Sequence, residues 1–430
     1  MMDWKQIYNS KLVSVEKAAA AIKSGDRIWF APCSGAPIQV LEALADRVDE
    51  LQDVHVISGL YLHPFKFMKD PKFIGRINAH TMFYGPYERN FFKVGNITIN
   101  SVTFSKVHLY LRDYYKANVL ATEVSPPDDD GYMTYGAMGV SWNGMVADKA
   151  DRIIVQVNKA QPKVHGIEHR IHVSKVTAIC EFDHPLPPLP LATPTEVDNK
   201  IADNLAPYVP DGAAIQFGVG GLANAIGYRL ESKKNLSIYT EMFTDSMLHL
   251  CKSGAVTGKI VAGFGLGSVE CYEFMADPRV ALKPNRIVND PAEVAKVDNF
   301  ISVQGTLMAD LTGQACSESL GFFQYSSTGG QLDFVLGAAL AKGGKSFLCL
   351  PSTVETKEGG RKSTITSELL PGAAVTTPRS AVMYMVTEHG VADLYLRPIP
   401  ERVKAMIGIA HPDFREGLRK QAIQAGLIKA

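Results

Sequence analysis

The stretch DGAAIQFGVGGLANAIGYRLESKKNLSIYTEMF, residues 211–243, decides the fold class. Two apolar runs of strand length, AAIQFGV and LSIYTEMF, flank a glycine-bearing loop and a segment with the apolar spacing of a helix. Strand, loop, helix and strand in this order predict a βαβ unit with parallel strands. The second run carries a carboxylate, Glu241, where we expect the strand to end.

The same order of strand, glycine-bearing loop, helix and strand occurs near the N-terminus, in SGDRIWFAPCSGAPIQVLEALADRVDELQDVHVISGLY, residues 24–61. We interpret the pair as an internal duplication; a chance likeness of two βαβ units is the alternative. Glu241 aligns with Gly59, and an acid with a purely structural role would be expected in both copies or in neither. The aligned pairs are Gly25 with Gly212, Ile28 with Ile215, Phe30 with Phe217, and Val56 with Ile238.

Apolar runs and helix-period segments alternate along the rest of the chain, which is typical of α/β architecture with largely parallel sheets. A chain of 430 residues exceeds one ordinary core, so two or three domains are expected. The prolines of DHPLPPLPLATPTEVD, residues 183–198, disfavour both helix and central strand and indicate an extended linker. We predict an N-terminal domain over residues 1–185, a linker over 186–196 and a C-terminal domain over 197–430.

Composition narrows the class of protein. Lys plus Arg and Asp plus Glu both number 44, and no basic stripe stands out, which argues against nucleic acid or an anionic membrane as the main partner. The six cysteines are scattered without a CxxC pair, as in a protein with reduced thiols. The N-terminal segment lacks the apolar core of a signal peptide, and no run is long enough to span a bilayer. We therefore expect a cytoplasmic protein.

The candidate chemistry lies at strand ends, because open α/β sheets bind ligands outside the carboxyl ends of their strands. The loop FGVGGLANA, residues 217–225, allows close approach of a ligand to the backbone, and the helix after it presents free N–H groups. With Glu241 it forms a plausible pair of nucleophile and oxyanion donors. Taken alone, the loop is no more than a tight turn.

Other motifs are weaker. GFGLGS, residues 263–268, is not GxGxxG, so we expect a glycine-rich turn near the site rather than a dinucleotide motif. HGIEHRIH, residues 165–172, lacks the order of a zinc motif, and no metal is expected. Gly337 inside a helix predicts close packing. Glu388 follows another strand, and Lys342 and Lys345 either meet phosphate or are solvated.

Together these motifs resemble the acetyl-CoA hydrolase/transferase family, which belongs to the class I CoA-transferases. By the length of the chain and its GGQLDF motif, the chain is most similar to the 4-hydroxybutyrate and butyryl-CoA:acetate transferases of that family. The motifs that carry the resemblance, in chain order, are SPPDDDGYMTYG, VQVNKAQPKVHG, DGAAIQFGVGGLANAI, YTEMFTD, STGGQLDF, AKGGKSFLCLPS, VTEHGVADL and RVKAMIGIAHPDFRE.

The resemblance implies two open α/β domains with the active site at their interface, and coenzyme A as a cosubstrate without a prosthetic group. It makes Glu241 the nucleophile and gives the oxyanion hole to the backbone at Val219 and Gly330. It carries CoA binding onto Gly218, Val219, Gly220, Gly221, Leu222, Gln331, Gly337 and Lys342. It carries the substrate pocket onto Asn289, Glu388 and, in the loop APCSGAP of residues 31–37, Ser34 and Pro37.

The implied activity is CoA transfer between an acyl-CoA and a short-chain carboxylic acid through a glutamyl-CoA thioester. An acyl-CoA hydrolase on the same site is the alternative. A CoA-sensing protein and a Rossmann-type oxidoreductase fit less well, because Glu241 has no counterpart in the first copy and GxGxxG is missing. Ser246, and Ser327 with Thr328, depart from the glycines expected there and bear on acyl preference. A homo-oligomer is expected, as is usual for such a scaffold.

Overall fold

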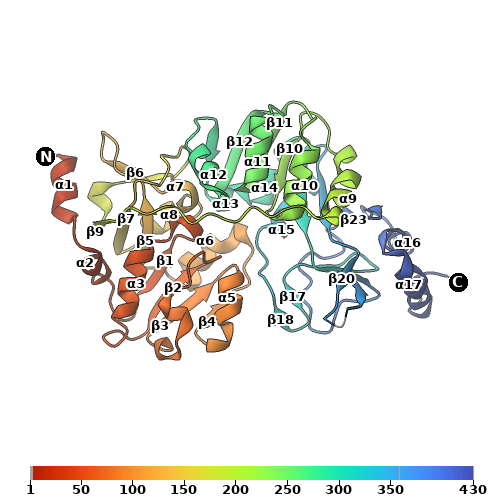
Figure 1. Ribbon diagram of the computed structural model, residues 1–430, viewed down its shortest axis with the longest axis horizontal. Coiled ribbons are helices and arrows are strands. Elements are labelled where there is room, and N and C mark those ends of the chain that lie inside the picture. The colour runs from red at the N-terminus through yellow and green to blue at the C-terminus, as the bar shows by residue number, and fades with distance from the viewer. Residues whose placement is uncertain (1–2, 358, 430) are drawn as a thin grey trace. The chain divides into compact units, whose positions relative to one another are not determined.

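The protein forms two compact units (Figure 1), each described here by itself. The computed structural model describes residues 3–357 and 359–429. The first unit comprises Met1–Pro190, Glu241–Phe243 and Ile260–Val288, and the second comprises Leu191–Thr240, Thr244–Lys259 and Asn289–Ala430.

A seven-stranded sheet forms the centre of the first unit, in the order β4-β3-β2-β1-β5-β7-β9. All six neighbouring pairs run parallel, as the sequence predicts. The strands are β1 (Arg27–Phe30), β2 (Val54–Ser58), β3 (Ile77–Thr81), β4 (Ile97–Ile99), β5 (Val119–Val124), β7 (Arg152–Val157) and β9 (Ala178–Glu181).

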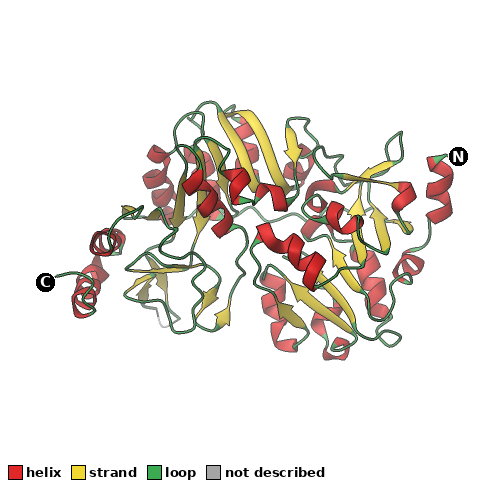
Figure 2. Ribbon diagram, turned by 180° about the vertical axis from the view of Figure 1, so that it is seen from behind, coloured by secondary structure: helices red, strands yellow, loops and turns green. Residues whose placement is uncertain are grey.

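Side chains of β1 alternate between the two faces of this sheet. Ile28 and Phe30 belong to an apolar core that also contains residues of α2 (Val15–Ala19) and α3 (Ile38–Asp46). Trp29 donates from its indole Nε1 to Asn143 Oδ1 of α8 (Asn143–Ala147) at 2.8 Å. Helices therefore cover both faces, as a parallel sheet requires (Figure 2).

The second sheet has eight strands in the order β13-β12-β11-β10-β14-β19-β23-β24. β10 pairs in parallel with β11 and β14, β14 with β19 and β19 with β23, whereas β24 closes the edge in antiparallel. The strands are β10 (Ala214–Phe217), β11 (Leu236–Phe243), β12 (Val256–Gly265), β13 (Val280–Leu282), β14 (Phe300–Gly305), β19 (Lys345–Cys349), β23 (Tyr384–Thr387) and β24 (Gly390–Asp393).

The remaining elements are short or peripheral. In the first unit they are α1 (Trp4–Lys11), α4 (Lys66–Lys69), α5 (Pro86–Phe91), α6 (Val107–Leu109), a π-helix (Tyr110–Tyr114), β6 (Tyr132–Thr134), α7 (Gly136–Gly139), β8 (Arg170–His172), α12 (Val269–Phe274) and α13 (Asn285–Val288). In the second unit they are α9 (Glu196–Leu205), α10 (Gly221–Arg229), α11 (Asp245–Lys252), α14 (Pro291–Val294), β15 (Met308–Asp310), β16 (Ala315–Cys316), β17 (Ser319–Leu320), β18 (Phe323–Gln324), α15 (Gln331–Leu340), β20 (Thr353–Glu355), β21 (Arg361–Ser363), β22 (Ile365–Thr366), α16 (Ile399–Ile409) and α17 (Pro412–Gln424).

The two sheets share one strand order, with β10, β11, β14 and β19 in the places of β1, β2, β5 and β7. The aligned glycines Gly25 and Gly212 both have positive φ, +82° and +75°. Their amides donate to Gln52 O at 3.0 Å and to Lys234 O at 2.9 Å, so the turns are alike. The internal duplication stays a prediction, which this equivalence supports.

The register of the strands agrees with the sequence alignment as well. Ile28 is opposite Val56 between β1 and β2, and Ile215 is opposite Ile238 between β10 and β11. The two copies differ beyond these pairs, because β2 ends at Ser58, directly before Gly59, whereas the strand equivalent to it runs on to Phe243.

The proline-rich segment has no helix or strand from Phe182 to Thr195. Thr195 then caps α9, because its hydroxyl accepts the Asp198 N–H at 3.1 Å and the Asp198 carboxylate accepts the Thr195 N–H at 2.9 Å. Within the described ranges, no helix has the length and apolar character that crossing a bilayer demands.

Candidate functional site

Glu241 lies within β11 and is half-buried, two residues before the strand ends at Phe243. The prediction that the strand ends at this acid is therefore wrong by two residues. The strand continues because its backbone has further partners: Phe243 O accepts the Leu266 N–H at 2.9 Å. The same carbonyl accepts the Cys271 thiol at 3.8 Å. These bonds hold the acid-bearing strand end in the first unit.

Gly263 of β12 lies against the backbone of Glu241. A β-carbon at Gly263 would stand 2.7 Å from Glu241 O and 2.8 Å from Asn285 Oδ1. Only glycine leaves room there, so the glycine serves close strand packing. The predicted glycine-rich turn is wrong for Gly263 to Gly265, which are strand; the turn begins at Leu266.

The segment Ile260–Val288 is bonded to the N-terminal half of the chain. Leu282 donates its N–H to His165 O at 2.8 Å and accepts the Ile167 N–H at 2.9 Å. Asn285 donates its N–H to Ser141 O at 3.0 Å. Through this segment and Glu241–Phe243, the candidate nucleophile belongs to the same compact unit as the predicted acid-pocket loop.

That loop follows β1 and is buried throughout. Ser34 lies in a 3-10 turn (Cys33–Gly35), and its side chain is buried beside the Tyr272 phenol, with which its hydroxyl interacts. Pro37 is the N-cap of α3. The Cys33 thiol donates to Leu60 O at 3.2 Å, and both residues have positive φ, 50° and 52°. Strained backbone of this kind gathers at functional sites, and sequence reasoning missed it.

The predicted CoA loops lie in the second unit, each at the start of a helix. Gly220, with φ +110°, is the N-cap of α10, and Gly330 is the N-cap of α15. A β-carbon on Gly218 or Gly220 would meet no atom within 4 Å, so the backbone there is open to a ligand. Val219 is exposed, and Gly221 and Leu222 are half-buried.

Lys342 lies away from Gly330. It follows the C-terminal end of α15, and its carbonyl accepts the N–H of Asn299, the residue before β14. The ten residues of α15 span about 15 Å. The structure therefore places Lys342 at the amino ends of β14 and β19, whereas Gly330 starts the helix at its other end.

Gly337 faces α14. A β-carbon on this buried glycine would overlap the Val294 side chain, so the close packing that the sequence predicts is confirmed. Helix packing accounts for this glycine without a ligand. Gln331, the first residue of the same helix, is buried and donates from Nε2 to Thr377 Oγ1 at 3.3 Å, and Asn289 is fully buried.

The two departures from the expected glycines are accommodated locally. The Ser246 hydroxyl bonds Thr244 Oγ1 at 2.9 Å, and Gly227 of α10 leaves room for it, since a β-carbon there would stand 2.9 Å from Ser246 Cβ. Thr328 donates to the carboxylate of Glu318, with its hydroxyl 3.3 Å from Oε2.

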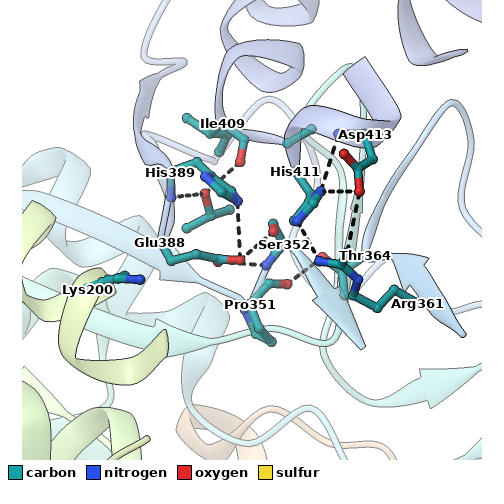
Figure 3. Close-up of polar contacts among 12 residues, drawn as sticks. Lys200, Pro351, Ser352, Arg361, Thr364, Glu388, His389, Ile409, His411 and Asp413 are labelled. Carbon is teal, nitrogen blue, oxygen red and sulfur yellow. Dashed lines mark hydrogen bonds and ion pairs between the residues drawn. The ribbon is translucent and has the colours of Figure 1, made fainter. Parts of the chain in front are cut away.

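Glu388 occupies the turn between β23 and β24 and is nearly buried (Figure 3). Ser352, which follows β19, donates its N–H to Oε2 at 2.9 Å and its hydroxyl to Oε1 at 2.5 Å. The carboxylate thus anchors the neighbouring strand end, and His389 Nε2 lies 3.5 Å from Oε1.

Beyond Glu388 lies a group of side chains that sequence reasoning missed (Figure 3). The rings of His389 and His411 meet edge to face with centroids 5.3 Å apart. Arg361 Nη1 lies 2.8 Å from His411 Nε2, and Asp413 donates its N–H to His411 Nδ1 at 3.3 Å. Burial lowers the pKa of His389, a shift that the Glu388 carboxylate opposes.

Two cavities lie elsewhere, in the first unit. One of about 420 Å³ is lined by Trp4, Tyr8 and Phe182, among others. The other, of about 330 Å³, is lined by Leu111, Arg112 and other residues. No predicted site residue lines either cavity.

The geometry defines an α/β protein with a strand-borne carboxylate and two glycine loops at helix N-termini. Residues 1–190 match the acetyl-CoA hydrolase/transferase N-terminal domain, and residues 267–422 match the C-terminal domain of the same name. The chain belongs to the acetyl-CoA hydrolase/transferase family, as the motifs predict.

Several relatives match over nearly their whole length. The chain is 40% identical to succinyl-CoA:cyclohexane-1-carboxylate CoA transferase of Geobacter metallireducens, over 97% of this chain and 96% of the relative. It is 35% identical to 4-hydroxybutyrate coenzyme A transferase of Clostridium kluyveri, with 98% and 99% coverage. It is 34% identical to butyryl-CoA:acetate CoA-transferase of Anaerostipes caccae, with 99% and 98% coverage.

A solved structure gives the same fold. The crystal structure of RipA from Yersinia pestis superposes with a TM-score of 0.93 at 33% identity, covering 99% of this chain and 100% of RipA. The predicted open α/β architecture is thereby confirmed.

Proposed function

We propose that the protein transfers CoA from an acyl-CoA to a short-chain carboxylic acid through a glutamyl-CoA thioester on Glu241. One observation carries the proposal: Glu241 follows Ile238 by three residues, and the glycine loop follows Ile215, its register partner, by three. A strand-borne carboxylate suits nucleophilic attack on a thioester carbonyl, and the helix N-terminus that follows β10 offers backbone N–H groups for an oxyanion. The likeness to three named CoA-transferases supports the same activity.

In the first half-reaction, a carboxylate oxygen of Glu241 attacks the thioester carbonyl carbon. The tetrahedral intermediate collapses to an acyl-glutamyl anhydride and expels CoA as the thiolate. The thiolate then attacks the glutamyl carbonyl carbon, which yields the glutamyl-CoA thioester and releases the first acid as its carboxylate. The energy of the thioester bond is retained on the protein.

The second half-reaction runs the same steps in reverse. The carboxylate of the acceptor acid attacks the glutamyl thioester and expels the CoA thiolate, which leaves a new mixed anhydride. The thiolate attacks the acyl carbonyl carbon of this anhydride. The new acyl-CoA departs and the Glu241 carboxylate is restored, so the kinetics are ping-pong.

Each tetrahedral intermediate carries an oxyanion, and we assign its stabilisation to the backbone N–H groups at Val219 and Gly330. The support is local: both residues adjoin helix N-termini, where free N–H groups and the helix dipole favour negative charge. One such donor is typically worth about 3 kcal/mol in the transition state. We assign CoA contacts to Gly218–Leu222 and Gln331, and contacts at Gly337 and Lys342 stay predictions, since these residues lie toward the far end of α15.

We assign the acid pocket to Ser34 and Pro37, with Asn289 and Glu388 as further contributors. The buried Ser34 hydroxyl and the Tyr272 phenol beside it support this assignment, because both are groups that can donate a hydrogen bond to a carboxylate. We further propose that the protein works in the cytoplasm, where its six free cysteines stay reduced.

The test is the intact mass of the protein after mixing with acetyl-CoA in the absence of an acid. We expect wild type to gain the mass of CoA less one water, and Glu241→Ala and Glu241→Gln to gain none while melting at the wild-type temperature. Acetate, butyrate, 4-hydroxybutyrate and cyclohexane-1-carboxylate should each be tried for discharging the adduct. The fastest acid identifies the preferred acceptor.

A hydrolase on the same site would behave differently. Its adduct would decay in water at a rate that no added acid increases, and free CoA would accumulate. An adduct that forms equally in Glu241→Gln would remove Glu241 from the role of nucleophile. Borohydride adds a second check, because it reduces a glutamyl thioester and inactivates the protein only after acyl-CoA has been added.

A further inference from the structure

Glu123 is a fully buried carboxylate near the end of β5, and four side chains donate hydrogen bonds to it. Gln156 Nε2 donates to Oε1 at 2.7 Å, and His184 Nε2 bonds the same oxygen. Asn158 Nδ2 and Gln161 Nε2 donate to Oε2 at 3.1 Å and 2.9 Å. The two oxygens thus accept four bonds, which fixes the carboxylate in place.

These residues gather at the carboxyl edge of the first sheet. Glu123 lies near the end of β5 and Gln156 near the end of β7, and His184 follows β9. The acid-pocket loop leaves the same edge, because it follows β1, the neighbour of β5. Sequence positions far apart therefore converge on one side of the sheet.

Gln161 connects the carboxylate to the loop. Its Nε2 donates one hydrogen to Glu123 Oε2 and the other to Ser34 O at 2.6 Å, so both N–H bonds of the amide are used. Gly136 makes room for this side chain, since a β-carbon on Gly136 would overlap Gln161 Oε1. The Gln161 amide thereby fixes the Ser34 carbonyl in place.

Gln156 makes a second connection of the same kind. Its Nε2 donates to Glu123 Oε1 and to Gln39 Oε1 at 2.8 Å. Gln39 lies in the first turn of α3, directly after the loop ends at Pro37. One buried carboxylate thus holds the middle of the loop through one glutamine and its far end through another.

We propose that Glu123 is a positioning residue for the acid pocket, which it serves by fixing Gln161 and, through it, Ser34. The proposal rests on the proposed function, because it takes the pocket to be the loop of residues 31–37. A plain apolar core would keep this loop folded. The glutamine bridge additionally fixes the direction of the Ser34 peptide, and hence the position of the buried Ser34 side chain.

The test uses Gln161→Leu, which keeps the size of the side chain and removes both hydrogen bonds. The glutamyl-CoA adduct is formed from acetyl-CoA, and its discharge is followed over a series of acetate concentrations. We expect the half-saturating acetate concentration to rise about tenfold or more, with a smaller change in the maximal rate. Glu123→Gln should produce the same rise, because the new amide places its own N–H groups against the side chains that donate to Glu123 in wild type.

Asn96→Leu is the matched control. Asn96 is an equally buried amide in the same unit, whose Nδ2 donates to Phe67 O at 2.6 Å and Ile77 O at 2.9 Å. It precedes β4 and so lies at the opposite edge of the sheet. We expect this variant to lose thermal stability and to keep the wild-type half-saturating concentration.

Two outcomes would overturn the inference. One is a half-saturating acetate concentration in Gln161→Leu within twofold of wild type. The other is an equal rise in Asn96→Leu, which would reduce the effect to general destabilisation. Failure of wild type to form any adduct is a separate result, because it removes the proposed function and the inference together.

Discussion

The Glu388 carboxylate accepts two hydrogen bonds from Ser352, one from its N–H at 2.9 Å and one from its hydroxyl at 2.5 Å. Glu388, which follows β23, is thereby fixed by Ser352, which lies in the loop after the neighbouring strand β19. A substitution of Ser352 can remove the hydroxyl bond alone, because the bond from the backbone N–H does not depend on the side chain.

We expect Ser352→Ala to lower the rate of CoA transfer about tenfold while changing the melting temperature little, since one bond to a charged group is lost. Thr364→Val is the matched control: the Thr364 hydroxyl donates to Pro351 O at 2.6 Å, next to Ser352, without touching Glu388. Steady-state kinetics of both variants check the prediction. Equal losses in the two would mean that the loop, rather than the acid, is what Ser352 supports.

Gly337→Ala should destabilise the protein by about 1–3 kcal/mol, because the new methyl group would overlap Val294. Urea denaturation measures the change. Val294→Ala should relieve part of it, so that the double variant is more stable than the sum of the single changes predicts. Strict additivity would show that α14 and α15 separate freely.

His184 should make the stability depend on pH. Its hydrogen bond with Glu123 raises the pKa of the imidazole in the folded protein. The resulting stabilisation is fully present below the unfolded pKa, about 6.5, and is lost as pH rises through the higher folded value. The difference in unfolding free energy between wild type and His184→Gln should therefore shrink from pH 6 to pH 9. A difference that grows over this range would contradict the ion pair.

Glu88 should produce a second pH effect. Burial raises the pKa of this carboxyl group to about 7, although it accepts the N–H bonds of Tyr61 at 3.0 Å and Gly85 at 3.1 Å. A raised folded pKa gives stability that is present below about 4.3 and is lost as pH rises through about 7. Wild type should thus lose stability between pH 5 and pH 8, and Glu88→Gln should lose less over the same interval. Parallel curves for the two proteins would remove Glu88 from this role.

Much of the fold could be predicted from local pattern. The glycines at 25 and 212, and the apolar pairs after them, reflect turn and strand preferences that act within a few residues. The extent of β11 could not be predicted in this way. It runs past Glu241 because Phe243 O bonds Leu266, a partner fixed by tertiary structure.

The spatial relations among the candidate site residues could not be predicted for a similar reason. Lys342 and Gly330 belong to successive motifs only twelve residues apart, yet α15 lies between them and sets them at its opposite ends. His389, His411 and Arg361 lie far apart in sequence, and no local signal joins them. The four donors around Glu123 come from two segments, because His184 lies after β9 and apart from the other three. The one local signal was the motif that holds three of them, Gln156, Asn158 and Gln161.

Gly59, which aligns with Glu241, limits what the first copy can carry at the end of β2. A β-carbon on Gly59 would lie 3.1 Å from Phe83 N and 3.3 Å from Phe83 Cβ, because the chain after β3 (Ile77–Thr81) closes over the end of β2. A glutamate at this position would therefore crowd Phe83, which would have to shift by a few tenths of an ångström to admit it. The two copies share a strand order but are not equivalent: the first contributes the predicted acid-pocket loop and is crowded at Gly59, so our proposal gives each chain one reactive carboxylate, Glu241.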